Sequence, residues 1–296
     1  MPTFERSVLA LLLLFSLAGT ALSAPPAAAP GKPAAAHPYT LTVIPYYSPE
    51  KIWTKYSPLI DHLKRATGKP WELKLYHNHD ALLDALCGGE VSFALLGPVP
   101  LGRAIDRCGV GIEAVALGKD GKPFYRAVIA TGDPAVRTLA DLKGRRFALF
   151  KGSTAAHIIP LKMLREAGIA EAELAPVFYE SQDRMVNALL ERDASGGGVK
   201  EVLYRKFRGD QLRLLKMSDP VPGFAIASAP AVNAAARTSL AAALTALDPR
   251  GAATDRQLMQ EWDEEVKNGF ILPPAAYRSS VLAILSVYRE ITHEVR

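Results

Sequence analysis

The sequence predicts an α/β protein built as two lobes, and three observations lead to this fold class. Short apolar runs, typical of buried strands, alternate with segments whose apolar residues recur at the 3.6-residue period of helices. About 260 residues follow the N-terminal segment, which is enough for two compact lobes. Turn-forming residues break the alternation twice, so we expect the chain to cross between lobes near Ala130 and again near Gly223.

The first part of the chain contains one complete series of strands and helices. The helix that includes Ile52 places Tyr56 and Leu59 on the same face, and Gly68 ends it. The expected strands cover residues 40–44, 71–76, 91–96, 112–117 and 124–131, and the expected helices cover residues 52–63, 81–86 and 99–107. Because strands alternate with helices, we expect a parallel, doubly wound sheet.

A second series begins after the break at Gly132-Asp133-Pro134. Its expected strands cover residues 146–150, 173–179, 211–217 and 224–228, and its expected helices cover residues 154–167 and 183–191. The C-terminal third is expected to be helical over residues 233–247, 255–268 and 274–292.

Residues 1–23 have the pattern of an export signal that is removed from the mature protein. Arg6 gives a basic start, residues 8–17 form a short apolar run, and small residues at Ala21 and Ser23 suit cleavage after Ser23. The alternative interpretation is an uncleaved membrane anchor, for which the run is short. No cysteine follows the signal, so we expect a periplasmic protein that is not a lipoprotein, with residues 24–38 as an Ala/Pro-rich tether.

Charge and cysteine content limit the classes of function. The net charge is +5, but the basic residues are scattered, so nothing indicates a nucleic-acid partner. Cys87 and Cys108 are the only cysteines, and in an oxidising compartment an even number favours a disulfide. A metal site made from these two residues, without Cys-x-x-Cys spacing, is the weaker interpretation.

The turn Gly152-Ser153-Thr154 is the candidate binding element. It follows an expected strand and opens an expected helix, whose N-terminus offers free N–H groups and a partial positive charge. Two hydroxyls and a glycine there predict an anion cradle, although Ser and Thr are also the most common helix caps. Ligands of open α/β sheets bind at the carboxyl ends of strands, which favours the cradle.

An exported hydrolase is the alternative class, and the sequence gives it little support. The cluster His77-Asn78-His79-Asp80 could hold a metal, but a solvated loop suits it better because no His-Glu-x-x-His follows. Ser153 and His157 lie one turn apart, yet helix geometry points them in different directions. The nucleophile elbow and the phosphate loop are both missing from the sequence, so we expect no enzyme activity and no cofactor.

Several motifs resemble those of the periplasmic phosphate/phosphite/phosphonate-binding proteins of ABC transporters. They are residues 125–129, Asp133-Pro134, residues 138–148, Gly152-Ser153-Thr154, Pro160, residues 218–223, Gly269-Phe270 and Tyr277. The resemblance covers residues 39–288 in order. It implies a type II periplasmic-binding fold with a two-stranded hinge, in which residues 39–130 and 224–296 form lobe 1 and residues 131–223 form lobe 2.

The resemblance also implies a set of ligand-binding residues. The family's Ser-Thr-Ser group matches Ser153, Thr154 and Ala155, so two of three hydroxyls are present. The other matching positions are Tyr125, His79 in place of a Tyr, Gln182 in place of a His, and Ser195 in place of an Asp. In aminophosphonate binders that Asp suits the ammonium group of the ligand, so its replacement argues against an aminophosphonate here.

The residues beside this set have two interpretations each. His79 and Gln182 supply further donors for a tetrahedral oxyanion. Lys151 either attracts the anion or is a solvated turn lysine, and Gly97 either offers its N–H or forms a simple turn. Tyr47, like the tyrosine before it, either lines the cleft or packs in the core near the hinge.

The sequence therefore predicts an exported, monomeric substrate-binding protein. Its two lobes are expected to close on a small oxyanion of the phosphate, phosphite or phosphonate type and to deliver it to the membrane permease of an ABC transporter. The alternative is a periplasmic sensor that presents its closed form to a membrane receptor, and the fold would be the same in both cases.

Overall fold

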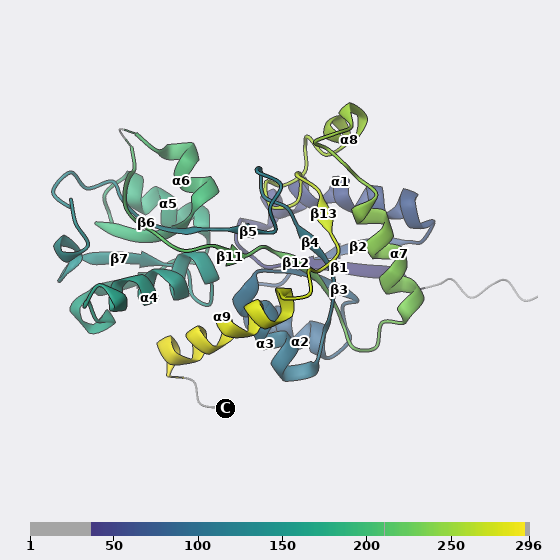
Figure 1. Ribbon diagram of the computed structural model, residues 1–296, viewed down its shortest axis with the longest axis horizontal. Helices are drawn as coiled ribbons and strands as arrows, with labels where there is room; N and C mark the ends of the chain where they lie inside the picture. The colour runs from purple at the N-terminus through teal and green to yellow at the C-terminus, as the bar shows by residue number, and fades with distance from the viewer. Residues whose placement is uncertain (1–36, 210, 294–296) are drawn as a thin grey trace, which may run out of the picture. The chain divides into compact units, whose positions relative to one another are not determined.

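The computed structural model describes residues 37–209 and 211–293. The expected export signal (1–23) and all but the last two residues of the expected tether (24–38) lie outside the described residues. Within the described ranges, no helix combines the length and the apolar character needed to cross a bilayer. The described chain contains two main sheets, and we call each sheet with its helices a lobe (Figure 1).

Lobe 1 contains a six-stranded sheet in the order β13-β4-β12-β3-β1-β2. Its strands are β1 (Tyr39–Val43), β2 (Trp71–Lys74), β3 (Phe93–Leu96), β4 (Gly111–Ala116), β12 (Ala225–Ser228) and β13 (Phe270–Ile271). Its helices are α1 (Pro49–Thr67), α2 (His79–Cys87), α3 (Pro98–Cys108), α7 (Ala234–Thr245) and α8 (Ala253–Leu258). The central strands are mostly apolar and buried, as in a sheet covered on both faces, whereas the edge strand β2 alternates between buried and exposed residues.

The sheet of lobe 1 is mixed, which corrects the expectation of a purely parallel sheet. β1 pairs parallel with β2 and β3, whereas β12 pairs antiparallel with β3 and β4. The reason is the route of the chain, because β12 re-enters this sheet directly from the other lobe without a crossover helix.

Lobe 2 contains a five-stranded sheet in the order β10-β6-β9-β7-β8. Its strands are β6 (Ala127–Thr131), β7 (Arg146–Leu149), β8 (Ala175–Phe178), β9 (Gly196–Lys200) and β10 (Arg213–Met217). Its helical segments are η1 (Ala140–Leu142), η2 (Thr154–Ile158), α4 (Ile159–Glu166), η3 (Glu171–Glu173), α5 (Gln182–Leu190) and α6 (Glu201–Phe207). Neither β9 nor α6 was expected from the sequence.

Two short strands connect the lobes. β5 (Phe124–Tyr125) and β11 (Val221–Pro222) pair antiparallel as a separate two-stranded ribbon. Residues 127–130, which the sequence analysis assigned to lobe 1, lie in β6 and pair within the sheet of lobe 2. The chain therefore leaves the first sheet before β5, and the predicted division of residues into lobes stays a prediction.

The C-terminal region differs from the expectation in one helix. The helix expected over residues 255–268 is short, because α8 ends at Leu258 and turns follow. These turns bury Trp262 and Asp263. The last helix, α9 (Tyr277–Thr292), packs against α3 of lobe 1 and α4 of lobe 2 (Figure 1). It therefore connects the lobes at a place separate from the ribbon.

A disulfide joins two helices of lobe 1. Cys87 ends α2 and Cys108 ends α3, and their sulfur atoms are bonded with the Cα atoms 5.7 Å apart. The residues that begin these two helices, His79 and Pro98, lie at the other ends. The bond therefore fixes two helices whose N-termini both approach the site described next.

Candidate functional site

Four helical segments begin around one small cavity between the lobes. α2 and α3 come from lobe 1, whereas η2 and α5 come from lobe 2. The cavity, of about 10 Å³, is lined by Ile44, His79, Gly97, Pro100, Tyr125, Ser153, Thr154, Ala155, Gln182, Lys200 and Phe224. Such a space is close to the size of one water molecule. Because helix N-termini carry partial positive charge, their convergence favours a negative charge in the cavity.

The Ser153 turn supplies backbone donors on the lobe 2 side. Gly152 has a φ of +76°, which a glycine adopts without strain, and Ser153 then caps η2 by accepting the Ala156 N–H at 3.2 Å. The N–H groups of Thr154 and Ala155 have no hydrogen-bond partner among the described residues. The turn is thus both a cap and a source of free donors.

A proline widens the start of this helix. Pro160 has no N–H to give to the Ala156 carbonyl, which instead accepts the Phe150 N–H at 3.0 Å. The first turn, η2, is accordingly π-helical, with the Ile158 N–H bonded to the Ser153 carbonyl at 3.1 Å. Gly198 of β9 allows this turn to lie on the sheet, because a Cβ there would collide with the Pro160 ring.

The start of α3, on the lobe 1 side, has few donors. Pro98 and Pro100 have no N–H, and the Val99 N–H between them donates to the Thr154 hydroxyl oxygen at 2.9 Å. Gly97 lies against the Phe224 ring. A Cβ at Gly97 would lie 3.3 Å from the Phe224 ring, so a larger residue would press against it, and the Val99 bond ties the two lobes directly across the cavity.

Two histidines form hydrogen bonds with the Lys151–Gly152 peptide group, one residue before Ser153. His79 Nδ1 lies 3.2 Å from the Lys151 carbonyl oxygen, and the Gly152 N–H donates to His157 Nδ1 at 3.1 Å. Burial lowers the pKa of each histidine to about 4, so both are neutral near pH 7. Lys151 contributes its carbonyl group to this arrangement, while its side chain is on the exposed turn.

Gln182 begins α5 and is also buried in the cavity wall. Its N–H donates to the Tyr46 carbonyl at 3.0 Å, so the first turn of α5 is attached to lobe 1. The next residue, Asp183, forms an ion pair with Lys51 of α1 at 2.9 Å, and both side chains are partly exposed. Lobe 2 therefore contacts lobe 1 through backbone and side-chain bonds on this side.

Lys200 is a site residue that the sequence analysis did not predict. It ends β9, and its ammonium group lies 4.1 Å from the Tyr125 ring centre and 4.2 Å from that of Phe224. It also forms a buried ion pair with Glu265 of lobe 1. Burial lowers the pKa of Lys200 and raises the pKa of Glu265, and the mutual attraction of the two groups opposes both shifts.

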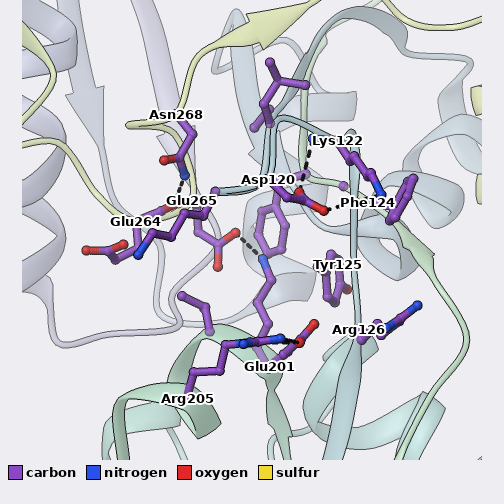
Figure 2. Close-up of a pocket in the computed structure, with 18 of the residues that line it drawn as sticks. Asp120, Lys122, Phe124, Tyr125, Arg126, Glu201, Arg205, Glu264, Glu265 and Asn268 are labelled. Carbon is purple, nitrogen blue, oxygen red and sulfur yellow. Dashed lines mark hydrogen bonds and ion pairs between the residues drawn. The ribbon is translucent and has the colours of Figure 1, made fainter. Parts of the chain in front are cut away.

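A second, larger cavity of about 750 Å³ lies on the other side of Lys200. Figure 2 shows this cavity, with Tyr125 and Glu265 in its wall and Arg126 and Arg205 nearby. Tyr125, Lys200 and Phe224 line both cavities and so separate them. The only sequence signal for Lys200 was a charged residue at the end of an apolar, glycine-rich run.

Seven of the nine predicted binding residues line the small cavity, and two do not. Ser195 lies just before β9, whereas the end of β9 at Lys200 reaches the cavity, so Ser195 does not line it and its role in binding stays a prediction. The Ser195 hydroxyl donates to Asp133 at 3.1 Å. Tyr47 does not line the cavity: it packs against Tyr46, with the Lys51 ammonium 3.7 Å from its ring centre, which is the contact expected if it packs near the hinge.

The His77–Asp80 cluster does not come together as a set of metal ligands among the described residues. No group of three His, Cys, Asp or Glu residues that could hold a metal ion occurs among the described residues. His79 instead faces the Lys151 carbonyl, while Asp80 pairs with Arg103 at 2.8 Å. The cavity therefore offers hydrogen-bond donors and helix N-termini as its means of recognition.

A family model for the periplasmic substrate-binding protein of phosphonate ABC transporters matches residues 41–272. The chain belongs to this family. A relative from Mycolicibacterium smegmatis, called phosphate-import protein PhnD, is 24% identical over 213 residues, which are 64% of this chain and 65% of that protein. A putative aliphatic sulfonates-binding protein of Escherichia coli is 29% identical over 103 residues, 34% of this chain and 31% of that one. The chain thus matches less than two thirds of the length of either relative.

Solved structures show the same fold at low sequence identity. PhnD1 of Prochlorococcus marinus, determined with methylphosphonate, superposes with a TM-score of 0.75 at 13% identity, covering 86% of this chain and 98% of that one. The match confirms the type II periplasmic-binding fold that the sequence resemblance implied. The proteins of this family are substrate-binding components of transport systems and not enzymes.

Proposed function

We propose that this chain is an exported receptor that closes on one small tetrahedral oxyanion and delivers it to the permease of an ABC transporter. The observation that carries the proposal is the meeting of four helix starts, two from each lobe, at one buried cavity. Backbone N–H groups and hydroxyl groups can bind several oxygen atoms at once, as a tetrahedral oxyanion requires.

The charge balance of the cavity supports an anionic ligand. His79 is neutral, and Lys200, the charged residue of the wall, is paired with Glu265. An anion would therefore be held by helix dipoles and hydrogen bonds, and not by an unpaired positively charged side chain. The small volume also implies that the lobes separate at the β5–β11 ribbon before a ligand enters and close behind it.

Titration calorimetry on ligand-stripped protein tests the binding part of this proposal. We expect heat from at least one of phosphate, phosphite and methylphosphonate, with sulfate and methanesulfonate measured alongside. The double variant Ser153→Ala/Thr154→Ala should bind about 100-fold or more weakly, because it loses two hydroxyl donors to an anion. Binding of none of these anions would contradict the proposal.

A control is needed because Ser153 also caps a helix. Asn233→Ala removes a comparable cap, at the exposed start of α7, where the side chain accepts the Ala236 N–H at 2.9 Å. Each cap is worth about 1 kcal/mol of stability. The Asn233 variant should lose stability and keep its affinity, whereas an equal loss of affinity in both would show a purely structural role for Ser153.

Delivery is tested separately, in cells. A strain that lacks this chain should lose high-affinity uptake of the anion that the purified protein binds, and the wild-type gene should restore it. Restoration by the Ser153→Ala/Thr154→Ala variant, or unchanged uptake without the chain, would contradict the transport role.

A further inference from the structure

His79 offers the small cavity one polar atom, the ring nitrogen Nε2. The residue begins α2, lines the cavity and is only 7% exposed. Its Nε2 is buried and has no hydrogen-bond partner among the residues that the structure describes. A buried polar atom without a partner costs free energy, so a ligand that supplies the partner gains affinity at this point.

The other ring nitrogen decides whether Nε2 donates or accepts. His79 Nδ1 lies 3.2 Å from the Lys151 carbonyl oxygen, which can only accept a hydrogen bond. Nδ1 therefore carries the proton, and in a neutral imidazole the second nitrogen then has a lone pair and no proton. Nε2 is consequently an acceptor in a cavity whose other groups mostly donate.

The surroundings of the ring keep it neutral. Burial, the largest effect, and the Arg103 charge lower the pKa of His79 to about 4, while the Lys151 carbonyl and Asp80 act in the opposite direction. The apolar ring of Phe150 packs 5.3 Å away, centre to centre. The ring is therefore unprotonated at Nε2 near pH 7.

The remaining charged and titratable groups nearby do not reverse this. His157, on η2, is also neutral because burial, with a smaller contribution from the Lys151 charge, lowers its pKa to about 4. Lys200, in the cavity wall, is balanced by its partner Glu265. The acceptor character of His79 Nε2 thus follows from the whole environment of the ring.

We infer that His79 determines specificity by accepting a hydrogen bond from the ligand, so that the cavity prefers a phosphorus oxyanion that keeps one P–OH group to a sulfonate or sulfate. This inference rests on the proposed function, because it names the ligand class of the same site. It also distinguishes phosphorus from sulfur oxyanions as ligands, since the relatives named above include both a phosphate-import and a sulfonates-binding protein.

Shape and charge alone do not distinguish a phosphonate from a sulfonate. A singly protonated phosphonate and a sulfonate are both tetrahedral and both carry one negative charge, and they differ by one proton. Backbone N–H and hydroxyl donors bind the bare oxygens of either ligand. The P–OH group, however, donates to His79 Nε2, whereas a sulfonate oxygen would face the Nε2 lone pair and leave it unsatisfied. A sulfonate therefore binds well only if His79 first takes a proton from solvent.

The test uses methylphosphonate and methanesulfonate, which are matched in shape. Calorimetry is done below the second ionisation of the phosphonate, where each probe carries one negative charge. We expect methylphosphonate to bind at least about tenfold more tightly. Above that ionisation its affinity should fall by about tenfold per pH unit, because the P–OH proton is lost. Methanesulfonate should instead gain affinity as the pH falls toward 4, and its binding should take up protons, so the heat measured should vary with the ionisation enthalpy of the buffer.

Two variants separate the acceptor from the shape of the ring. His79→Phe keeps a ring but removes the acceptor, so its affinities for methylphosphonate and methanesulfonate should differ by less than about threefold. His79→Gln offers an amide that either accepts or donates, so methanesulfonate binding should improve relative to the wild type. Thermal unfolding confirms that each variant is folded, and either variant alone is sufficient to judge the inference.

The outcomes distinguish this inference from the proposed function. Equal affinity of the wild type for the two probes, or an affinity for methylphosphonate that rises with pH, would overturn the role of His79 and leave the oxyanion receptor in place. An unchanged preference in folded His79→Phe protein would do the same. Failure of the wild type to bind any tetrahedral oxyanion would overturn both.

Discussion

His79 and His157 hold the same peptide group but use it in opposite ways. His79, at the start of α2 in lobe 1, donates from Nδ1 to the Lys151 carbonyl, while His157, on η2 in lobe 2, accepts the Gly152 N–H at Nδ1. Both are buried, and burial lowers the pKa of each to about 4. Near-identical burial and pKa thus accompany opposite tautomers, one leaving a bare Nε2 and the other an Nε2–H.

This difference teaches that burial alone does not define what a histidine offers a ligand. The partner of Nδ1 decides it, because a carbonyl forces a proton onto that nitrogen and an N–H forces it off. The Lys151–Gly152 peptide presents one group of each kind, so a single peptide sets both tautomers. Changes to this peptide or to either ring should therefore have different effects on stability, on affinity and on the preference between ligands.

The largest effect is expected from Gly152→Ala. The position has a φ of +76°, and an added Cβ would lie 2.9 Å from His79 Nδ1. We expect the free energy of unfolding to fall by about 3 kcal/mol or more, and the affinity for the anion to fall by about 100-fold, because the peptide moves away from His79. Chemical denaturation and calorimetry measure the two changes.

Gly168→Ala is the matched control for this variant. Its φ is +75°, but nothing lies within 4 Å of the added Cβ. It therefore has the same backbone strain without the contact to His79, and its affinity should stay at the wild-type value. If both variants lose affinity alike, the contact with His79 is not what matters.

For each of the two histidines, a smaller effect is expected from acidification of the wild type. A histidine that is neutral when folded and has an ordinary pKa when unfolded takes up protons preferentially in the unfolded state below pH 6.5. Stability is thus fully present above about pH 6.5 and is lost as the pH falls toward 4, by about 2 kcal/mol per histidine between pH 7 and pH 5.

Variants assign this pH dependence to the two rings. Denaturation midpoints across this range should show a shallower slope in His79→Phe and in His157→Phe, by similar amounts. A slope that stays the same in both variants would mean that other groups cause the loss of stability.

The smallest effect is expected from His157→Gln. The amide oxygen of glutamine can still accept the Gly152 N–H, so we expect affinity to fall by less than about threefold. The preference for methylphosphonate over methanesulfonate should not change, because His157 does not line the small cavity. A change in that preference equal to that of His79→Gln would show that the two histidines act as one unit.

Much of the fold was predictable because its strands are apolar and its helices amphipathic. The failures have local causes. The strand Gly196–Lys200 begins with three glycines, which have no side chains to show a pattern, and they are required where neighbouring groups approach the backbone. The expected helix over residues 255–268 ended early, at Leu258, where turns place Trp262 and Asp263 in the core.

The candidate site was predictable where it depends on local sequence. Ser153 and Thr154 follow a strand and open a helix, which is visible in the sequence. Lys200 and its ion pair with Glu265 were not, because the two residues are far apart in the chain and meet only when the lobes meet. The tautomer of His79 likewise depends on a carbonyl contributed by the other lobe.

The disulfide between Cys87 and Cys108 makes the stability of the cavity wall depend on the oxidation of two thiols. The bond closes a loop with a sequence separation of 21, and this loop contains Gly97 and Pro100 of the cavity wall. Closing a loop of this size removes about 3 kcal/mol of chain entropy from the unfolded state. The oxidised chain should therefore resist unfolding more than the reduced chain does, and α2 and α3 of the cavity wall stay joined at their C-terminal ends.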